Sequence, residues 1–254
     1  MRLYLSRGRT QRRLHLAGAL AVATIACAPS AFGGAQCNVP DELMRVDETL
    51  PHLSERLHEG GPVKIVAIGG ASTIGAAAGS ANLAYPHRLQ EVLSRRYPNM
   101  PITVVNKGVP RQTAHQMLER FPSDVIAEDP VLVIWEAGTT DAVRGAEVEE
   151  LAAALQSGID ELKTRSIDIM LIDMQFSRST ATVIDFERYL NAVHRVGDVN
   201  DVYVFPRFEM MRYWSEQNVF NFDGVSKDER ASLAASVYEC IAKKLADAIR
   251  VATQ

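Results

Sequence analysis

Hydrophobic runs of strand length recur along the chain after residue 60, and stretches of helical periodicity separate them. Most runs are nearly continuous rather than alternating, which is typical of parallel strands buried on both faces. The predicted strands are residues 63–68, 102–106, 131–135, 167–172 and 202–205. A polar stretch with scattered Leu, residues 41–61, predicts a short helix ahead of the first strand.

The intervening stretches place apolar side chains on one helix face. The predicted helices are residues 86–97, 114–121, 147–165 and 182–196, with a last helix from about residue 228. Strands that alternate with helices form βαβ units with right-handed crossovers. We therefore predict a three-layer α/β/α fold around a five-stranded parallel sheet in the flavodoxin-like order.

The first 35 residues differ from the rest in charge and hydropathy. Five Arg precede an apolar run over residues 16–28, and no acidic residue occurs before Asp41. A basic region, a short apolar run and then small residues form the pattern of a signal peptide, and this run is too short to span a bilayer. We predict a signal peptide over residues 1–35, cleaved after Gly33 or Ala35, and a secreted or periplasmic protein.

Two variants of this leader stay open. Arg12-Arg13 would serve as a twin-arginine signal, although the flanking residues match poorly. Residues 24–27, Thr-Ile-Ala-Cys, would serve as a lipobox, although Thr24 stands where Leu is usual.

The composition of the 254-residue chain is ordinary for a globular protein, at 47% hydrophobic and 23% charged. Residues 36–254 suit a single α/β domain. The charged residues of the leader are all basic. Its removal therefore leaves 22 basic and 31 acidic side chains, a net charge near −9. Such a surface is a poor partner for nucleic acid or anionic membranes. We predict neither a stable membrane span nor a cofactor.

Two cysteines remain in the mature chain, Cys37 and Cys240. In an oxidising compartment they would pair and tie the N-terminal segment to the last helix. The alternative is two free thiols. We favour the disulfide because neither cysteine has another partner in the mature chain.

Functional groups of such folds gather at the carboxyl ends of the strands. Four loops there carry candidate chemistry: residues 69–75, 106–109, 136–141 and 222–226. The first, Gly-Gly-Ala-Ser-Thr-Ile-Gly, is a glycine-rich turn into a helix, which can bind an anion or present a nucleophile. It lacks the ending of a P-loop and the glycine spacing of a dinucleotide-binding turn.

Taken in this order, the four loops resemble the SGNH (GDSL-type) hydrolase family over nearly all of the mature chain. The resemblance extends to Tyr85-Pro86, Val133-Ile134-Trp135 and Arg207-Phe208. It implies the SGNH hydrolase fold and the hydrolysis of esters, with acyl groups on lipids or carbohydrates as substrates. It also implies a serine nucleophile, an oxyanion hole made by Gly and Asn, and a histidine base that an Asp orients.

The nucleophile position of the family falls on an alanine in this chain. Gly69, Thr73 and Gly75 fix the register against Gly-Asp-Ser-x-Thr-x-Gly, so that Ala71 stands where the Ser belongs. Alanine has no oxygen to attack an ester. Ser72, one residue further along, is the alternative nucleophile if the turn is repacked, although a polar residue in a first helical turn usually satisfies backbone N–H groups.

Only two of the other four family groups are kept. Gly108 and Asp223 match the oxyanion glycine and the acid, whereas Thr140 and Ser226 replace Asn and His. Thr140 has a hydroxyl but lacks the reach of an Asn amide. Without the histidine, Asp223 has no imidazole to orient, and a carboxylate with a pKa of about 4 is a weak base for Ser72.

Ser226 and Asp223 also have structural interpretations. Residues 226–229, Ser-Lys-Asp-Glu, fit a capping box before the last helix. Asp223 is expected to hold its turn through an Asx-type hydrogen bond. Among the histidines, only His115 is expected near the strand ends, and His194 lies on the helix before the fifth strand.

Our leading hypothesis is therefore an exported, non-catalytic SGNH-like protein. It would bind an acyl or carbohydrate ligand in the cleft that holds the active site in the SGNH family. A weak or unconventional serine esterase that uses Ser72 and Asp223 is the alternative, and a scaffold protein with a vestigial cleft is the third. No His, Cys, Asp and Glu cluster has metal-ligand spacing, so no metal site is predicted.

Overall fold

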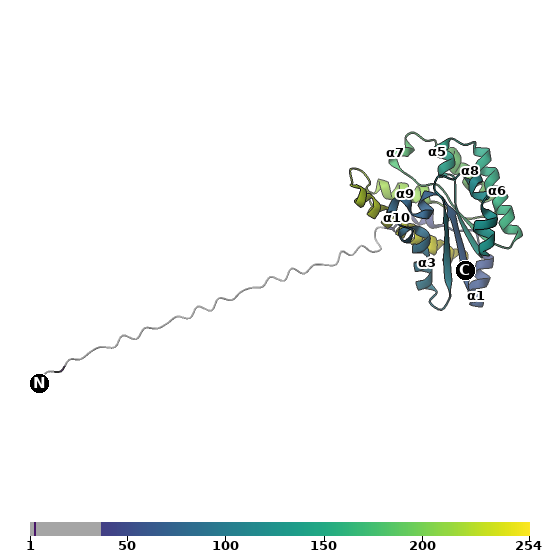
Figure 1. The fold of residues 1–254 in the computed structure, drawn as a ribbon, viewed down its shortest axis with the longest axis horizontal. Helices are drawn as coiled ribbons and strands as arrows, with labels where there is room; N and C mark the ends of the chain where they lie inside the picture. The colour runs from purple at the N-terminus through teal and green to yellow at the C-terminus, as the bar shows by residue number, and fades with distance from the viewer. Residues whose placement is uncertain (1–2, 4–36) are drawn as a thin grey trace. The chain divides into compact units, whose positions relative to one another are not determined.

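The protein is described from a computed structural model, which covers residue 3 and residues 37–254. The predicted signal peptide and both variants of it therefore lie outside the described residues. Five parallel strands form one sheet in the order β2-β1-β3-β4-β5, which confirms the predicted topology (Figure 1). The strands are β1 (Val63–Gly69), β2 (Ile102–Gly108), β3 (Leu132–Glu136), β4 (Asp168–Ile172) and β5 (Val204–Phe205).

Helices cover both faces of the sheet, because successive strand residues point to opposite sides and both sides are apolar. Ile65 and Ala67 face one core, whereas Val66 and Ile68 face the other. The first core is covered by α1 (Pro51–Glu59), α3 (Tyr85–Arg96), α9 (Arg207–Glu216) and α10 (Lys227–Ala252). The second is covered by α4 (Ala114–Leu118), α5 (Thr139–Arg144), α6 (Val148–Thr164) and α8 (Glu187–Val199).

Short helical turns complete the described part of the chain. Two are α-helical, α2 (Ala71–Ile74) and α7 (Arg178–Ala181), and one is a π-turn, η5 (Phe121–Val125). The 3₁₀ turns are η2 (Asp41–Met44), η3 (Ala76–Ala78), η4 (Ala81–Leu83) and η6 (Ile126–Glu128). Within this part of the chain, no helix is both long and apolar enough to cross a membrane.

Two helix predictions are wrong at their ends. The helix expected from residue 182 begins at Glu187, because Thr182, Val183 and Ile184 are β-branched and lose side-chain freedom in a helix. The helix expected over residues 114–121 ends at Leu118, and a π-turn that contains Pro122 follows it.

A disulfide joins Cys37 to Cys240 in α10, 203 residues further along, and confirms the predicted bridge. Two hydrogen bonds fasten the segment that follows the cysteine. The Trp214 indole donates to the Asn38 carbonyl at 3.0 Å, and the Leu50 amide donates to the Ala252 carbonyl at 2.8 Å. The segment thus lies on α9 and α10, the layer that also backs the candidate site.

Candidate functional site

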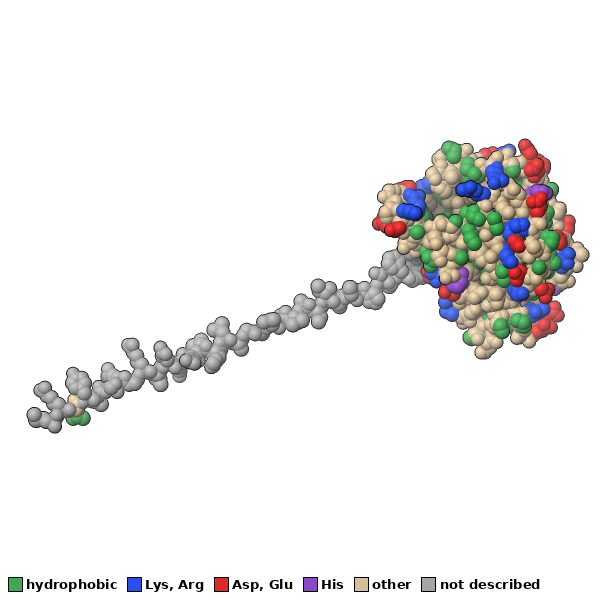
Figure 2. Space-filling model, viewed as in Figure 1, with side chains coloured by type: hydrophobic (Ala, Val, Ile, Leu, Met, Phe, Trp, Pro, Cys, Tyr) green, Lys and Arg blue, Asp and Glu red, His purple; other side chains and the backbone are tan. Residues whose placement is uncertain are grey.

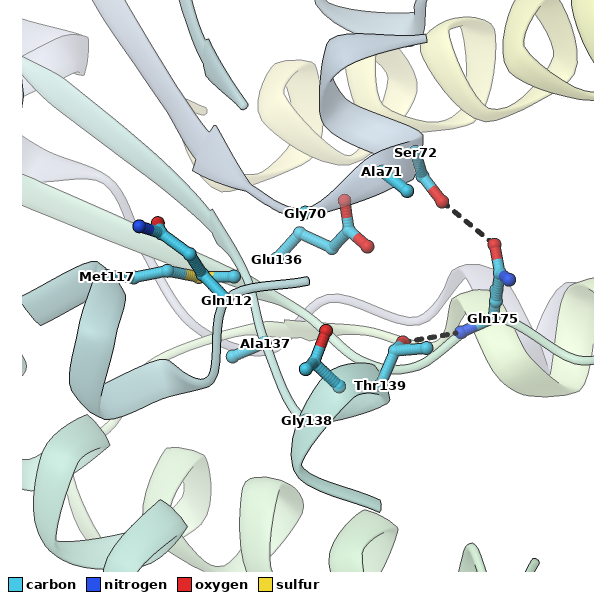
Figure 3. Close-up of a pocket in the computed structure, with 11 residues that line it drawn as sticks. Gly70, Ala71, Ser72, Gln112, Met117, Glu136, Ala137, Gly138, Thr139 and Gln175 are labelled. Carbon is cyan, nitrogen blue, oxygen red and sulfur yellow. Dashed lines mark hydrogen bonds between the residues drawn. The ribbon is translucent and has the colours of Figure 1, made fainter. Parts of the chain in front are cut away.

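A small cavity opens at the carboxyl ends of the strands, where α2 and α5 begin (Figure 3). Its volume is about 50 Å³. The lining consists of residues 70–72, Gln112, Met117, residues 136–140 and Gln175. The turns after β1 and β3 therefore meet here, as the sequence predicted, together with the turn after β4.

Ala71 is the first residue of α2 and is exposed to the cavity. Gly70 precedes it, and Gly75 ends the turn in the left-handed conformation, with φ of 83°. The first position of α2, where the sequence resemblance would put the nucleophile, thus carries a methyl group. No oxygen on residue 71 is available for attack on a carbonyl carbon.

Ser72 is buried, and its hydroxyl reaches across the cavity mouth rather than toward a base. Its Oγ donates to Oε1 of Gln175 at 2.9 Å (Figure 3). The Tyr238 phenol, whose pKa is raised chiefly by burial, lies next to the same hydroxyl. Neither an amide oxygen nor a protonated phenol can take the serine proton at neutral pH, so this arrangement does not activate Ser72.

A buried ion pair forms the wall beneath α2. Arg207 Nη2 donates to Glu136 Oε1 at 3.1 Å, and both side chains are almost fully buried. The other carboxylate oxygen, Oε2, accepts from the Thr73 amide at 3.1 Å and from the Thr73 hydroxyl. Glu136 therefore joins the end of β3 to α2 and α9. The sequence placed Glu136 and Arg207 in family blocks but gave no sign that they pair.

Gly108 supports the site from behind and does not line the cavity. Its amide donates to Asn106 Oδ1 at 3.0 Å, and Asn106 Nδ2 donates to the Thr73 carbonyl at 2.7 Å. A Cβ on Gly108 would lie 2.3 Å from the Ile74 amide nitrogen. The glycine thus permits the close approach of β2 to α2. Of the two predicted oxyanion positions, only Thr140 lies in the lining.

Asp223 and Ser226 lie away from the cavity lining. The Asp223 side chain is 74% exposed, and its carboxylate is 3.6 Å from an Arg178 guanidinium nitrogen. The Asx-type hydrogen bond predicted for Asp223 is made by Asn221 instead, whose Oδ1 accepts from the Asp223 amide at 2.9 Å. The structure therefore does not bring Asp223 and Ser72 into hydrogen-bond contact.

The predicted capping box before α10 is confirmed. Ser226 Oγ accepts from the Glu229 amide at 3.3 Å, and Glu229 Oε2 accepts from the Ser226 amide at 2.8 Å. The hydroxyl that stands where a catalytic histidine belongs is thus used to begin a helix.

Asp173 and His194 form a pair that the sequence did not reveal. Asp173 is fully buried after β4, and its carboxylate accepts from the Phe208 amide at 2.8 Å and from His194 Nε2 at 3.1 Å. The hydrogen bond to Asp173 raises the pKa of His194, and burial raises the pKa of Asp173. Within residues 37–254, no serine or threonine hydroxyl hydrogen-bonds the His194 ring.

His115, the histidine expected nearest the strand ends, does not line the cavity. It lies on the surface of α4, with its Nε2 3.7 Å from Oε1 of Glu119. Among the described residues, no group of three or more His, Cys, Asp and Glu side chains is arranged to hold a metal ion.

The model of the Non-GDSL lipase-like family matches residues 36–254. The chain belongs to this family. In this Non-GDSL lipase-like protein the matched region includes the disulfide, the sheet and every residue of the cavity. A comparison with curated proteins found no match.

Solved structures of esterases share the fold of this Non-GDSL lipase-like protein. An acetylxylan esterase from Geobacillus stearothermophilus has a TM-score of 0.59 at 20% identity, over 74% of this chain and 95% of that chain. A two-domain esterase active on acetylated mannans has a TM-score of 0.64 at 16% identity, over 85% of this chain and 58% of that one. At these identities the likeness confirms the SGNH hydrolase fold alone.

Proposed function

We propose that this Non-GDSL lipase-like protein is an exported, non-catalytic member of its family that binds a ligand in the former ester-hydrolase cleft. The observation that supports this most is Ala71 at the first position of α2, facing the cavity. The fold, the turn and the cavity are kept, and the atom that would attack an ester is not.

The supporting groups of the reaction are missing as well. Removal of one oxyanion donor costs roughly 10²–10³ in rate, and removal of a triad nucleophile or base costs more. Here Thr140 replaces an amide donor, and the amide of Gly108 is already bonded to Asn106. Ser226 caps a helix, so no imidazole stands beside Asp223. Several losses at one site favour binding over residual catalysis.

The alternative, a serine esterase that uses Ser72, draws on the position of Ser72 at the start of α2 beside the cavity. It requires a base, and the carboxylates nearby have other partners. Glu136 pairs with Arg207, and Asp223 lies in solvent beside Arg178. The scaffold hypothesis requires only that the cavity binds nothing.

Export and the class of ligand belong to the same proposal. A disulfide favours an oxidising compartment, consistent with the leader pattern. Two structural neighbours are described as esterases of acetylated xylan and acetylated mannan. Together with a lining in which polar side chains other than Glu136 are uncharged, they support an uncharged acyl-bearing carbohydrate as the ligand.

Turnover of short-chain p-nitrophenyl esters tests the loss of catalysis. We expect the purified protein and its Ser72→Ala variant to release p-nitrophenol at the same rate as buffer. Ser236→Ala, at a half-buried serine of α10 that does not line the cavity, is the matched control. Turnover that Ser72→Ala abolishes and Ser236→Ala leaves intact would overturn the proposal in favour of the esterase.

A further inference from the structure

The cavity presents hydrogen-bonding groups without any positive charge. No Lys, Arg or His side chain of residues 37–254 lines it, and Glu136 contributes a carboxylate to its wall. The other polar side chains of the lining are uncharged hydroxyls and amides: Ser72, Gln112, Thr139, Thr140 and Gln175. An anionic ligand such as a free carboxylate would face the Glu136 carboxylate, whose partner Arg207 does not line the cavity, so the cavity suits a neutral polar group.

The wall has unused capacity to accept hydrogen bonds. Glu136 Oε1 receives one hydrogen bond, from Arg207, whereas a carboxylate oxygen has room for two. This oxygen faces the turn at Gly70, where a Cβ would lie 4.0 Å away, and Figure 3 shows the carboxylate directed toward Gly70 and Ala71. Oε1 of Gln112, a second lining residue, has no hydrogen-bond partner. A complementary ligand group must therefore donate a hydrogen bond to these oxygens, and it must also accept one if it is to pair with the Ser72 hydroxyl.

The protein already places an amide at this site. The Gln175 carboxamide bonds to the Ser72 hydroxyl, and the Gln175 backbone amide lies 3.4 Å from Thr139 Oγ1, so the residue spans the mouth from α2 to α5 (Figure 3). The Ser72 hydroxyl thus donates to an amide oxygen in the structure itself. A ligand amide would make the same contact after it displaces Gln175.

The volume of the cavity favours an amide at the end of a ligand over a peptide bond within a chain. A cavity of about 50 Å³ has room for roughly four waters, which matches the four non-hydrogen atoms of an acetamido group. A peptide bond within a chain has substituents on both sides and needs a channel open at both ends. A sugar ring is too large and would remain outside the mouth.

We propose that the cavity binds the terminal acetamido group of an uncharged ligand in preference to the isosteric O-acetyl ester, and that Gln175 competes for the same contact. The amide N–H supplies a donor to the acceptor wall, whereas the bridging oxygen of an ester presents another acceptor to it. This inference rests on the proposed function, since it assigns the ligand class of the same cleft.

Three matched sugars test the proposal: the methyl glycoside of N-acetylglucosamine, methyl 2-O-acetylglucoside and methyl glucoside. Dissociation constants are measured by ¹H–¹⁵N NMR titration of the purified protein. We expect the acetamido sugar to bind about fivefold tighter than the ester, the effect of one hydrogen bond, and the unsubstituted sugar to bind weakest. Equal or tighter binding of the ester, or no binding of the acetamido sugar, would overturn the inference.

Failure of the inference is distinguishable from failure of the proposed function. If the ester binds better but stays intact, only the ligand class is wrong. If the ester is hydrolysed during the titration, the non-catalytic function itself is wrong, whatever the order of affinities.

Variants of Ser72 and Gln175 test whether these two side chains govern ligand binding, apart from any effect on folding. Ser72→Ala is expected to weaken acetamido binding several-fold, and Gln175→Ala to strengthen it, because the competing carboxamide is removed. Gln217→Ala, an exposed glutamine just after α9, is the matched control and should change nothing. Weaker binding by Gln175→Ala with an unchanged NMR spectrum elsewhere would refute the competition.

Discussion

At the scale of single residues, the proposed loss of catalysis rests on the identities at positions 71, 140 and 226. Ala71 occupies the helix start that presents a nucleophile in the family, and Ser226 has become the N-cap of α10. Ser72 is buried against Gln175 instead of a base. We therefore propose that the site keeps its cavity but lacks the groups that would transfer a proton.

Ala71→Ser tests whether the missing oxygen is the only defect. We expect this variant to fold and to remain inactive toward p-nitrophenyl acetate. Among the described residues no imidazole lines the cavity, and the carboxylate that does, Glu136, is ion-paired with Arg207 and is a weak base for the new hydroxyl. Circular dichroism controls for folding. Turnover well above buffer would show that a base activates the new hydroxyl at position 71, and loss of that turnover on adding His194→Gln would identify the base as His194.

At the scale of elements, buried polar pairs fasten the strand ends to the helices around the cavity. Glu136 joins β3 to α2 and α9, and Asp173 joins β4 to α8 and α9. The strands and most helices could be predicted because apolar periodicity is a local property of the chain. These pairs could not, since Glu136 and Arg207 are 71 residues apart and no local pattern couples them.

Glu136→Ala should destabilise the protein by about 3–5 kcal/mol, because it leaves the Arg207 guanidinium buried without its partner. Chemical denaturation measures the change. The double variant Glu136→Met, Arg207→Met removes both charges and is expected to recover most of the loss. If the double variant is as unstable as the single one, the pair is not the source of the effect.

His194→Gln tests the pair at the end of β4. Because the pKa of His194 is raised in the folded state, its stabilising contribution is complete below pH 6.5 and declines as pH rises through the raised pKa. Because the His194 side chain is 41% exposed, solvent screening limits this contribution to about 1 kcal/mol. We expect the free energy of unfolding to fall from pH 6.5 to pH 8.5 by more in the wild type than in the variant. Equal slopes would show that the pair does not titrate in this range.

At the scale of the whole molecule, a disulfide and a hydrogen-bonded N-terminal segment close a long loop around the α/β domain. The sheet order and the bridge between Cys37 and Cys240 were predicted, because few topologies fit alternating strands and helices and only two cysteines remain after the leader. The partnership of Ser72 with Gln175 was not, since it depends on how the turn after β4 folds over the cleft. On the face shown in Figure 2, acidic and basic side chains are interspersed.

Loss of the disulfide should lower stability without changing the cavity. Cys37→Ser with Cys240→Ser is expected to cost about 2–5 kcal/mol, because the bridge closes a loop of some 200 residues and restricts the unfolded chain. Thermal unfolding with and without reductant measures this. A melting temperature that neither reductant nor the variant changes would contradict the bridge in solution.

The most direct test of the central claim is labelling of the purified protein with a fluorophosphonate, which reacts with activated serines, followed by intact-mass spectrometry. We predict no mass increase under native conditions, because Ala71 has no hydroxyl and Ser72 donates to the Gln175 amide oxygen rather than to a base. Stoichiometric labelling that maps to Ser72 would contradict it and would establish a working serine nucleophile.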